Sequence, residues 1–339
     1  MSRSQPPGTE ILYLSHADVA RVGISMAETI DAVQELLMAR GRGEVLMPPK
    51  VGLYPSDRTW YHAQMSYAPS LRHAVIKWQS GYSDNPPRGL RYLMGLLILN
   101  DAETGAPLAV LESTWLTAQR TGAVSAISAR ALARPGASTL ALLGCGVQAR
   151  TQLEGLALGL PALDTVLLYD LVPEHAVRFA AWATERFPRL RFQTVASARE
   201  AVAGADVVVT AGPIERQAPR PIQPDWLRPG VLGLPLDYDC YWSGAALSAT
   251  DKYYVDDLEQ YRGYQAQGDF FQDGPPVAGD LPRLLIGQVA GRERDDERIV
   301  AMNLGISAED IAIAARIYQR ARAVGSGRWL PLYNEPASG

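Results

Sequence analysis

The feature that most constrains the fold is a glycine-rich turn between an apolar segment and a helical one. Residues 142–149 read Leu-Leu-Gly-Cys-Gly-Val-Gln-Ala and follow the apolar run Thr139–Leu143. Gly144 permits a tight turn, Gly146 lets the backbone approach a pyrophosphate, and Ala149 allows close packing of helix on strand. The free N–H groups that begin the helix would face the phosphates. The pattern therefore predicts a dinucleotide-binding Rossmann fold.

An acidic residue strengthens this prediction. Asp170 ends the next expected strand, 170 − 149 = 21 residues beyond Ala149. A carboxylate there accepts hydrogen bonds from the adenosine ribose and repels a 2′-phosphate. The next residue is Leu171 rather than Arg, which favours NAD over NADP. The alternative is that the glycines only form a tight turn, but the strand, the helix and the acid together favour an NAD site and an oxidoreductase.

Apolar strands alternate with helices from residue 139 onwards, which is typical of a doubly wound parallel sheet. Ser197 and Glu200 have the spacing of a capping box at one of the helix starts. The expected strands are Thr139–Leu143, Thr165–Tyr169, Arg191–Val195, Asp206–Ala211, Gly230–Leu236 and Lys252–Val255, and two expected helices are Val147–Leu160 and Pro173–Arg186.

The first third of the chain has a different character. A capping box, Ser25 with Glu28, begins a helix that runs to about Met38, and Pro48-Pro49 then ends regular structure. Short strands at hairpin-like spacing follow, which predicts an antiparallel sheet. These strands are Trp60–Tyr67, His73–Gln79, Tyr92–Leu99 and Pro107–Leu111.

Two further helices set the domain boundaries. One is the alanine-rich segment Thr121–Leu132, and the other is Ser307–Ala323, whose Ser307-x-x-Asp310 start resembles a capped helix. The last helix follows the α/β section and would return to the first domain. We therefore expect a discontinuous α+β domain, residues 1–121 and 306–339, and a Rossmann domain, residues 122–305.

Composition excludes several functional classes. The chain is 47% hydrophobic and 20% charged, has a net charge of −4, and has no basic stripe of the kind that binds nucleic acid. No apolar run approaches the roughly 18 residues of a membrane span. The two cysteines and four histidines show no metal-ligand spacing, so no metal is expected. Residues 1–8 are polar and resemble no signal peptide, so we expect a reduced, cytoplasmic setting.

Four charged residues are candidates for chemistry. Lys77, in Ala-Val-Ile-Lys-Trp, lies on the solvated face of its strand or points into a cleft, where burial would make it a general acid. Arg120 lies where the chain crosses between domains, and it is either a cleft residue or an ordinary surface arginine. Asp237 and Asp239 follow a buried strand, where each could be a base, an amine ligand or a turn former.

The sequence resembles the ornithine cyclodeaminase/mu-crystallin family over nearly its whole length. No single motif is specific, but their combination is. The motifs are Met47-Pro48-Pro49-Lys50, Val75-Ile-Lys77-Trp78, Thr117-Ala-Gln-Arg120-Thr121, Gly144-x-Gly-x-Gln148-Ala and Gly305-x-x-x-Glu309-Asp310.

This resemblance implies a substrate-binding and dimerising N-terminal domain, and therefore a homodimer. It implies that Lys50, Lys77 and Arg120 surround a substrate carboxylate, that Lys77 also exchanges a proton at the reacting carbon, and that Asp239 holds the substrate amine. Position 50 is often Arg in the family, and Lys50 lacks that planar fork. The cofactor-binding residues would be Thr121, Gly144, Gly146, Val147, Gln148, Asp170, Thr210 and Asn303.

The sequence departs from the family after Asp239. Family members usually continue Asp-x-Pro-Gly-Lys-x-Glu-Leu, whereas this chain has Asp-Cys-Tyr-Trp-Ser-Gly, and Asn303 replaces a common Ser. The difference argues against ornithine as the substrate. We therefore predict an NAD(H)-dependent oxidoreductase that acts at the α-carbon of an amino acid or its imino or keto form. The alternatives are a cyclodeaminase that releases ammonia and a non-catalytic protein that binds small ligands.

Overall fold

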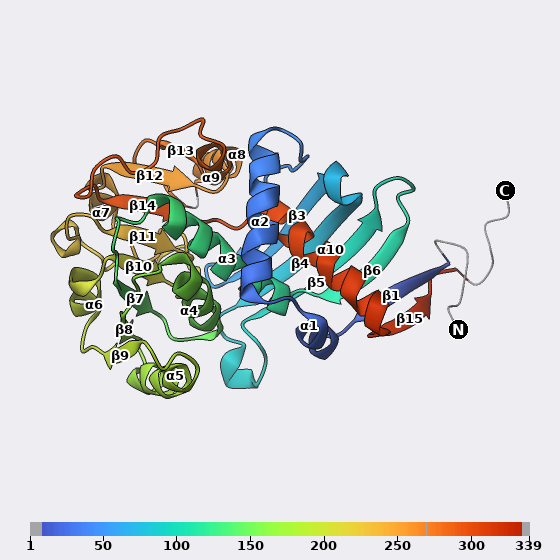
Figure 1. The fold of residues 1–339 in the computed structure, drawn as a ribbon, viewed down its shortest axis with the longest axis horizontal. Helices are drawn as coiled ribbons and strands as arrows, with labels where there is room; N and C mark the ends of the chain where they lie inside the picture. The colour runs from blue at the N-terminus through green and yellow to red at the C-terminus, as the bar shows by residue number, and fades with distance from the viewer. Residues whose placement is uncertain (1–8, 269, 334–339) are drawn as a thin grey trace. The chain divides into compact units, whose positions relative to one another are not determined.

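A computed structural model describes residues 9–268 and 270–333 of the chain (Figure 1). Residues 1–8, on which the expectation about a signal peptide depends, lie outside the described residues. The described residues form two compact units, one within Met1–Arg120 and Ile306–Gly339 and the other within Thr121–Gly305. Among the described residues, no helix has both the length and the apolarity that a membrane crossing requires.

The first unit is built on a seven-stranded sheet in the order β15-β1-β6-β5-β4-β3-β2. All neighbours pair antiparallel except β1 and β6. The predicted antiparallel strands are confirmed as β3 to β6. The sequence missed β2, an edge strand interrupted by Pro55, as well as β1 and β15. The strands are β1 Glu10–Leu14, β2 Val51–Ser56, β3 Thr59–Ala68, β4 His73–Tyr82, β5 Leu93–Asp101, β6 Pro107–Glu112 and β15 Arg328–Pro331.

Helices cover one face of this sheet. The helices of this unit are α1 His16–Val22, α2 Met26–Gly41 and α10 Ser307–Val324, and α10 contacts α2, β3 and β4 (Figure 1). The capping box at α2 is confirmed: the Ser25 side chain accepts a hydrogen bond from the Glu28 N–H, and the Glu28 carboxylate accepts one from the Ser25 N–H. This helix-covered face is called the inner face below.

The opposite face of the sheet is apolar and open. Ile76 on β4 pairs with Met65 on β3 and with Ile98 on β5, so their side chains share this face. Its large side chains are between 37% and 47% exposed. This surface, called the outer apolar face below, contains Met65, Ile76, Trp78, Met94, Leu96 and Ile98.

The second unit is a doubly wound parallel sheet, which confirms the predicted fold class. Its eight strands have the order β13-β12-β14-β11-β10-β7-β8-β9, and every neighbouring pair is parallel. The strands are β7 Thr139–Leu143, β8 Thr165–Tyr169, β9 Arg191–Thr194, β10 Val207–Thr210, β11 Leu232–Pro235, β12 Lys252–Val255, β13 Gly279–Asp280 and β14 Ile299–Met302. The helices are α4 Val147–Gly159, α5 Pro173–Arg186, α6 Ala198–Gly204, α7 Gly244–Ser248, α8 Leu258–Gln267 and α9 Leu281–Leu285.

Two helix starts differ from the sequence predictions. Helix α3 spans Thr114–Leu132 and so begins before the expected Thr121, because its first turns contain weak helix formers that tertiary burial stabilises. At α6, the Ser197 side chain caps the Glu200 N–H, but the Glu200 carboxylate accepts from the Ala196 N–H. The reciprocal half of that predicted capping box is therefore wrong.

Candidate active site

Lys77 is the buried centre of a charged cluster in the first unit. It lies on the inner face of β4 and none of its side chain is exposed, so of the two alternatives that the sequence left open, the solvated face is excluded. Its Nζ lies 2.7 Å from one carboxylate oxygen of Asp310 and 2.9 Å from the other, and 3.4 Å from the Thr117 hydroxyl. Burial lowers the pKa of Lys77 to about 8, although Asp310 opposes the shift.

Arg120 extends the cluster from α3. Its guanidinium Nη1 donates to the Glu309 carboxylate at 2.9 Å, and its Nε lies 3.5 Å from Asp310. Asp310 thus lies between the ammonium of Lys77 and the guanidinium of Arg120. Arg120 is 7% exposed, so it is not the ordinary surface arginine that the sequence left as an alternative.

The two acids come from the first turn of α10. The sequence suggested a capped start formed by Ser307 and Asp310, and that prediction is wrong: the N-cap is Ile306, and no side chain caps the helix. Ser307 instead contacts β3, because its hydroxyl lies 3.1 Å from the Ser66 hydroxyl, and Ser66 also donates to the Ser307 carbonyl. This contact anchors the start of α10 on the sheet and brings Asp310 to Lys77.

His62 is a member of the cluster that the sequence did not reveal. It stacks on Trp60 with 4.2 Å between ring centroids, and its Nε2 lies 3.1 Å from the Tyr54 hydroxyl. Burial and the nearby charges of Lys50 and Lys77 lower its pKa well below the ordinary value, so the imidazole is neutral. Lys50 is itself buried just before β2. Two expected carboxylate-binding lysines therefore lie near one histidine.

The glycine turn in the second unit has the geometry that a bound pyrophosphate requires. Gly144 has φ +97°, and a Cβ there would lie 2.7 Å from the Ala211 carbonyl oxygen, so only glycine fits. A Cβ on Gly146 would meet nothing within 4 Å. Gly146 is the N-cap of α4 and has no capping side chain, which leaves the helix start open to an anion. The residues present therefore fit a dinucleotide.

The expected cofactor-binding residues lie at the carboxyl ends of parallel strands. Asp170 follows β8 and accepts from the Cys145 N–H at 2.8 Å, which links the acid to the glycine turn. Thr210 ends β10, and Asn303 follows β14, where its amide lies 3.4 Å from the Ser128 hydroxyl. Carboxyl ends are where open α/β sheets bind ligands.

The other expected cofactor-binding residues lie on helices. Val147 is the first residue of α4 and is 70% exposed, and Gln148 follows with a buried side-chain oxygen that has no hydrogen-bond partner. Thr121 is buried within α3.

Asp237 and Asp239 have different partners. Asp237 is fully buried and accepts from the Thr210 hydroxyl at 2.7 Å and the Gly212 N–H at 2.8 Å. Burial raises the pKa of Asp237 to about 7. Asp239 accepts from the Phe271 N–H at 3.0 Å and lies 3.1 Å from Arg220, a pairing that the sequence did not indicate.

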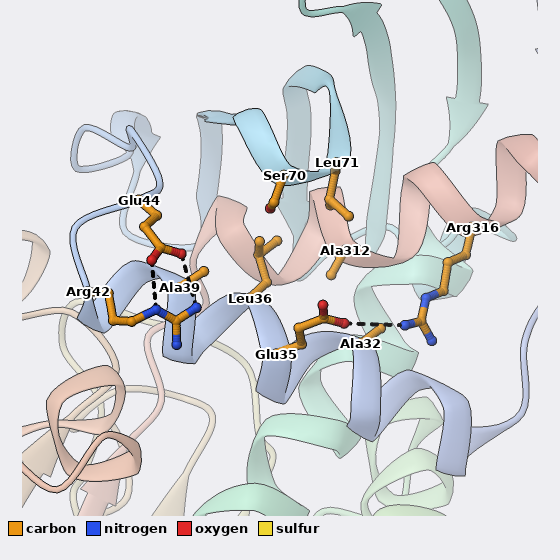
Figure 2. A pocket seen from close by; sticks show the side chains of 10 residues that line it. All are labelled: Ala32, Glu35, Leu36, Ala39, Arg42, Glu44, Ser70, Leu71, Ala312 and Arg316. Atoms are coloured by element: carbon orange, nitrogen blue, oxygen red, sulfur yellow. Dashed lines mark hydrogen bonds and ion pairs between the residues drawn. The ribbon is translucent and has the colours of Figure 1, made fainter.

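A surface pocket in the first unit is separate from the Lys77 cluster. Its floor contains small apolar side chains of α2 and α10, and its charged side chains pair with one another, Arg42 with Glu44 and Arg316 with Glu35 (Figure 2). Its lining residues are Ala32, Glu35, Leu36, Ala39, Arg42, Glu44, Ser70, Leu71, Ala312 and Arg316. None of the sequence-predicted site residues lines it.

Comparison with known proteins identifies the family. The model described as the ornithine cyclodeaminase/mu-crystallin family matches residues 11–325. An N-((2S)-2-amino-2-carboxyethyl)-L-glutamate dehydrogenase of Staphylococcus aureus is 32% identical to this chain. The alignment covers 96% of this chain and 99% of that protein. The chain belongs to the ornithine cyclodeaminase/mu-crystallin family, which confirms the resemblance.

Two solved structures share the fold over nearly the whole chain. The Δ1-pyrroline-2-carboxylate reductase of Thermococcus litoralis, in complex with NADH and L-proline, is 27% identical with a TM-score of 0.84, and the match covers 94% of this chain and 99% of that one. An archaeal alanine dehydrogenase dimer with bound NAD is 29% identical with a TM-score of 0.84, and the match covers 96% of this chain and 100% of that one.

The raised pKa of Asp237 makes the stability of the protein depend on pH. The folded protein keeps this proton up to about pH 7, whereas an unfolded aspartate releases it near its ordinary pKa of 3.8. The folded state therefore binds more protons between these values, and the free energy of unfolding falls as pH rises through them. In Asp237→Asn we expect this contribution to disappear. As pH rises, the free energy of unfolding of the variant should therefore increase relative to that of the wild type by up to about 1.4 kcal/mol per pH unit.

Urea unfolding at pH 5, 6, 7 and 8 measures this effect. Asp225→Asn is the matched control, because Asp225 is an exposed acid of the same unit. A constant difference between Asp237→Asn and the wild type at all four pH values would contradict the raised pKa.

Proposed function

We propose that this protein is an NAD(H)-dependent oxidoreductase that acts at the α-carbon of an amino acid or its imino or keto form. The observation that carries the proposal is the buried Lys77, which lies beside Arg120 and has a pKa near neutrality. Such a lysine is suited to exchange protons, which a guanidinium does not. The uncapped start of α4 offers its N–H groups to the cofactor pyrophosphate.

Each residue of the Lys77 cluster has a proposed role. Lys50 and Arg120 hold the substrate carboxylate, with the cationic form of Lys77 contributing. Lys77 gives a proton to the substrate nitrogen or oxygen in reduction and takes one back in oxidation. His62 stays neutral and adds no charge beside these cations. Bound NADH supplies the hydride to the α-carbon, and NAD⁺ accepts it in the reverse direction.

The choice of NAD rests on Asp170. Its carboxylate is fixed against the glycine turn by the Cys145 N–H and by the Val172 N–H at 2.9 Å. Held there, it offers acceptors to a ribose diol and repels a 2′-phosphate. We propose that Thr121, Gln148, Thr210 and Asn303 complete the cofactor contacts together with Gly144, Gly146 and Val147.

The acid that meets the substrate nitrogen is Asp237 or Asp239. Arg220 already provides a positive charge to Asp239, whereas Asp237 accepts hydrogen bonds from two neutral groups. Above about pH 7, where Asp237 has lost its proton, a carboxylate without a cationic partner attracts an ammonium or iminium group more strongly. The contacts therefore favour Asp237, although the sequence favoured Asp239.

A substrate panel tests the proposed function. Amino, keto and cyclic imino acids are offered with NADH or NADPH and with the oxidised cofactors, and absorbance at the nicotinamide band is followed. We expect net turnover with at least one α-imino, α-keto or α-amino acid and a preference for NAD(H), because Asp170 repels the 2′-phosphate.

Other outcomes of the panel support the alternatives. Ammonia release from a diamino acid without net NADH change would favour a cyclodeaminase. Binding without turnover, with Lys77→Ala indistinguishable from the wild type, would favour a protein that only binds small ligands. A clear preference for NADPH would contradict the role of Asp170.

We also propose that the outer apolar face pairs with a second copy of this chain. Its six apolar side chains form a contiguous surface across β3, β4 and β5, and such surfaces are typical of interfaces. A dimer about a two-fold axis buries the same surface on both copies. The similar archaeal alanine dehydrogenase is a dimer.

A charge on this face tests the dimer. In Leu96→Lys we expect a monomer, because pairing would bury an ammonium within an apolar interface. Leu158→Lys is the matched control, since Leu158 is 45% exposed compared with 47% for Leu96 but lies on α4. Light scattering after size exclusion should give twice 36.8 kDa for the wild type and the control, and 36.8 kDa for Leu96→Lys. A dimeric Leu96→Lys would contradict the assignment of this face.

A further inference from the structure

Lysine is rare in this protein, and its positions are informative. Of the 32 basic residues other than histidine, only Lys50, Lys77 and Lys252 are lysines, which leaves 32 − 3 = 29 arginines. Arginine stays charged under all ordinary conditions, whereas lysine loses its proton when its surroundings favour the neutral form. Two of the three lysines belong to one buried cluster, at the place where proton exchange is proposed.

The surroundings of Lys77 act on its charge in opposite directions. Complete burial and the positive charge of Arg120 favour the neutral amine. Asp310 favours the ammonium through a direct hydrogen bond and through its charge, and Glu309 acts in the same direction through its charge. Arg120, Glu309 and Asp310 act on Lys77 directly, and His62 is close enough that the charges of both Lys77 and Lys50 act on it.

Asp310 and Glu309 differ in their contacts although they are neighbours. Both are fully buried on the first turn of α10. The Asp310 carboxylate contacts Nζ of Lys77 through both oxygens, at 2.7 and 2.9 Å. The Glu309 carboxylate accepts from Arg120 at 2.9 Å. Asp310 therefore contacts Lys77 directly and also lies 3.5 Å from Arg120, whereas Glu309 pairs with Arg120.

We propose that Asp310 is the positioning residue of Lys77, which fixes the amine on the inner face of the sheet and holds it in the charged form that donates a proton to the substrate. This inference rests on the proposed function. In the reductive direction the proton leaves Nζ for the imine nitrogen or carbonyl oxygen while the α-carbon gains the hydride, and Lys77 then regains a proton from solvent. Asp310 remains a carboxylate throughout and touches no reacting atom.

The scarcity of lysine makes a direct test possible. With ¹³C-labelled lysine, the full-length protein gives signals from only three side chains, and the Lys77→Arg variant identifies the one that belongs to Lys77. Lys252, whose Nζ lies near Glu293 and Glu297, is an internal reference. The Lys77 signal of the wild type should titrate with a midpoint of about 8.

Asp310→Asn is the decisive variant, and Glu309→Gln is the control. Removing the charge that touches Nζ should lower the Lys77 midpoint by at least about one pH unit, because an opposite charge at this distance shifts a pKa by about 1–3. Glu309→Gln should shift it less, since Glu309 acts on Lys77 through its charge, whereas Asp310 acts through both its charge and a hydrogen bond. An unchanged midpoint in Asp310→Asn, or equal shifts in both variants, would overturn the proposal.

Activity gives the second readout. In Asp310→Asn the pH profile of kcat should move to lower pH in parallel with the titration, with a smaller change in KM. Asp310→Glu keeps the charge but displaces it, so the midpoint should stay within half a unit of the wild type while kcat falls at least tenfold. Full activity in Asp310→Glu would contradict a positioning role, and this variant decides the question if Asp310→Asn does not fold.

Failure of the proposed function is recognisable separately. If no substrate of the panel supports turnover of NADH, the proposed function is contradicted. The titration of Lys77 requires no turnover, so it still tests whether Asp310 governs the charge of this lysine.

Discussion

The buried pair of Lys77 and Asp310 is the interaction on which the rest of the first unit depends. Burying two charges costs several kcal/mol each, and a well-packed apolar pair would often be as stable or more stable. The pair is therefore weak evidence for stability. Breaking it would leave a buried charge without a partner, at a cost of about 3–5 kcal/mol. A costly arrangement that includes a lysine with a lowered pKa is typical of a functional site.

This pair joins two distant stretches of the chain within the discontinuous first unit. Lys77 lies on β4, Arg120 on α3 and Asp310 on α10, and Lys77 and Asp310 are 233 positions apart in the sequence. The chain builds a complete Rossmann unit between Arg120 and Ile306 before α10 supplies the two acids. The same β4 carries Lys77 inward and Ile76 outward, so one strand contributes to the proposed catalytic cluster and to the proposed dimer face.

The sequence predicted the features that local patterns determine. Strands β7, β8 and β12 were predicted with their observed bounds, because continuous apolar runs between helices are a strong signal. Alternation predicted that β4 has two faces but not which one is buried, so the sequence left open whether Lys77 is solvated or points into a cleft. Asp310 fitted a helix-capping pattern in the sequence, whereas its actual contact is with Lys77, which is distant in the sequence. No sequence pattern near Asp239 indicated its ion pair with Arg220.

The central claim is that Lys77 and Asp310 support hydride transfer at the α-carbon of the substrate. The most direct measurement follows deuterium from NADH that carries deuterium at both C4 positions of the nicotinamide into the product of the best imino or keto acid. Mass spectrometry should find one deuterium at the α-carbon of the product formed by the wild type, and Lys77→Met should form this product at least a hundredfold more slowly, since a general acid contributes about 10²–10⁴-fold. Product without deuterium at that carbon, or an unchanged rate in Lys77→Met, would contradict the claim.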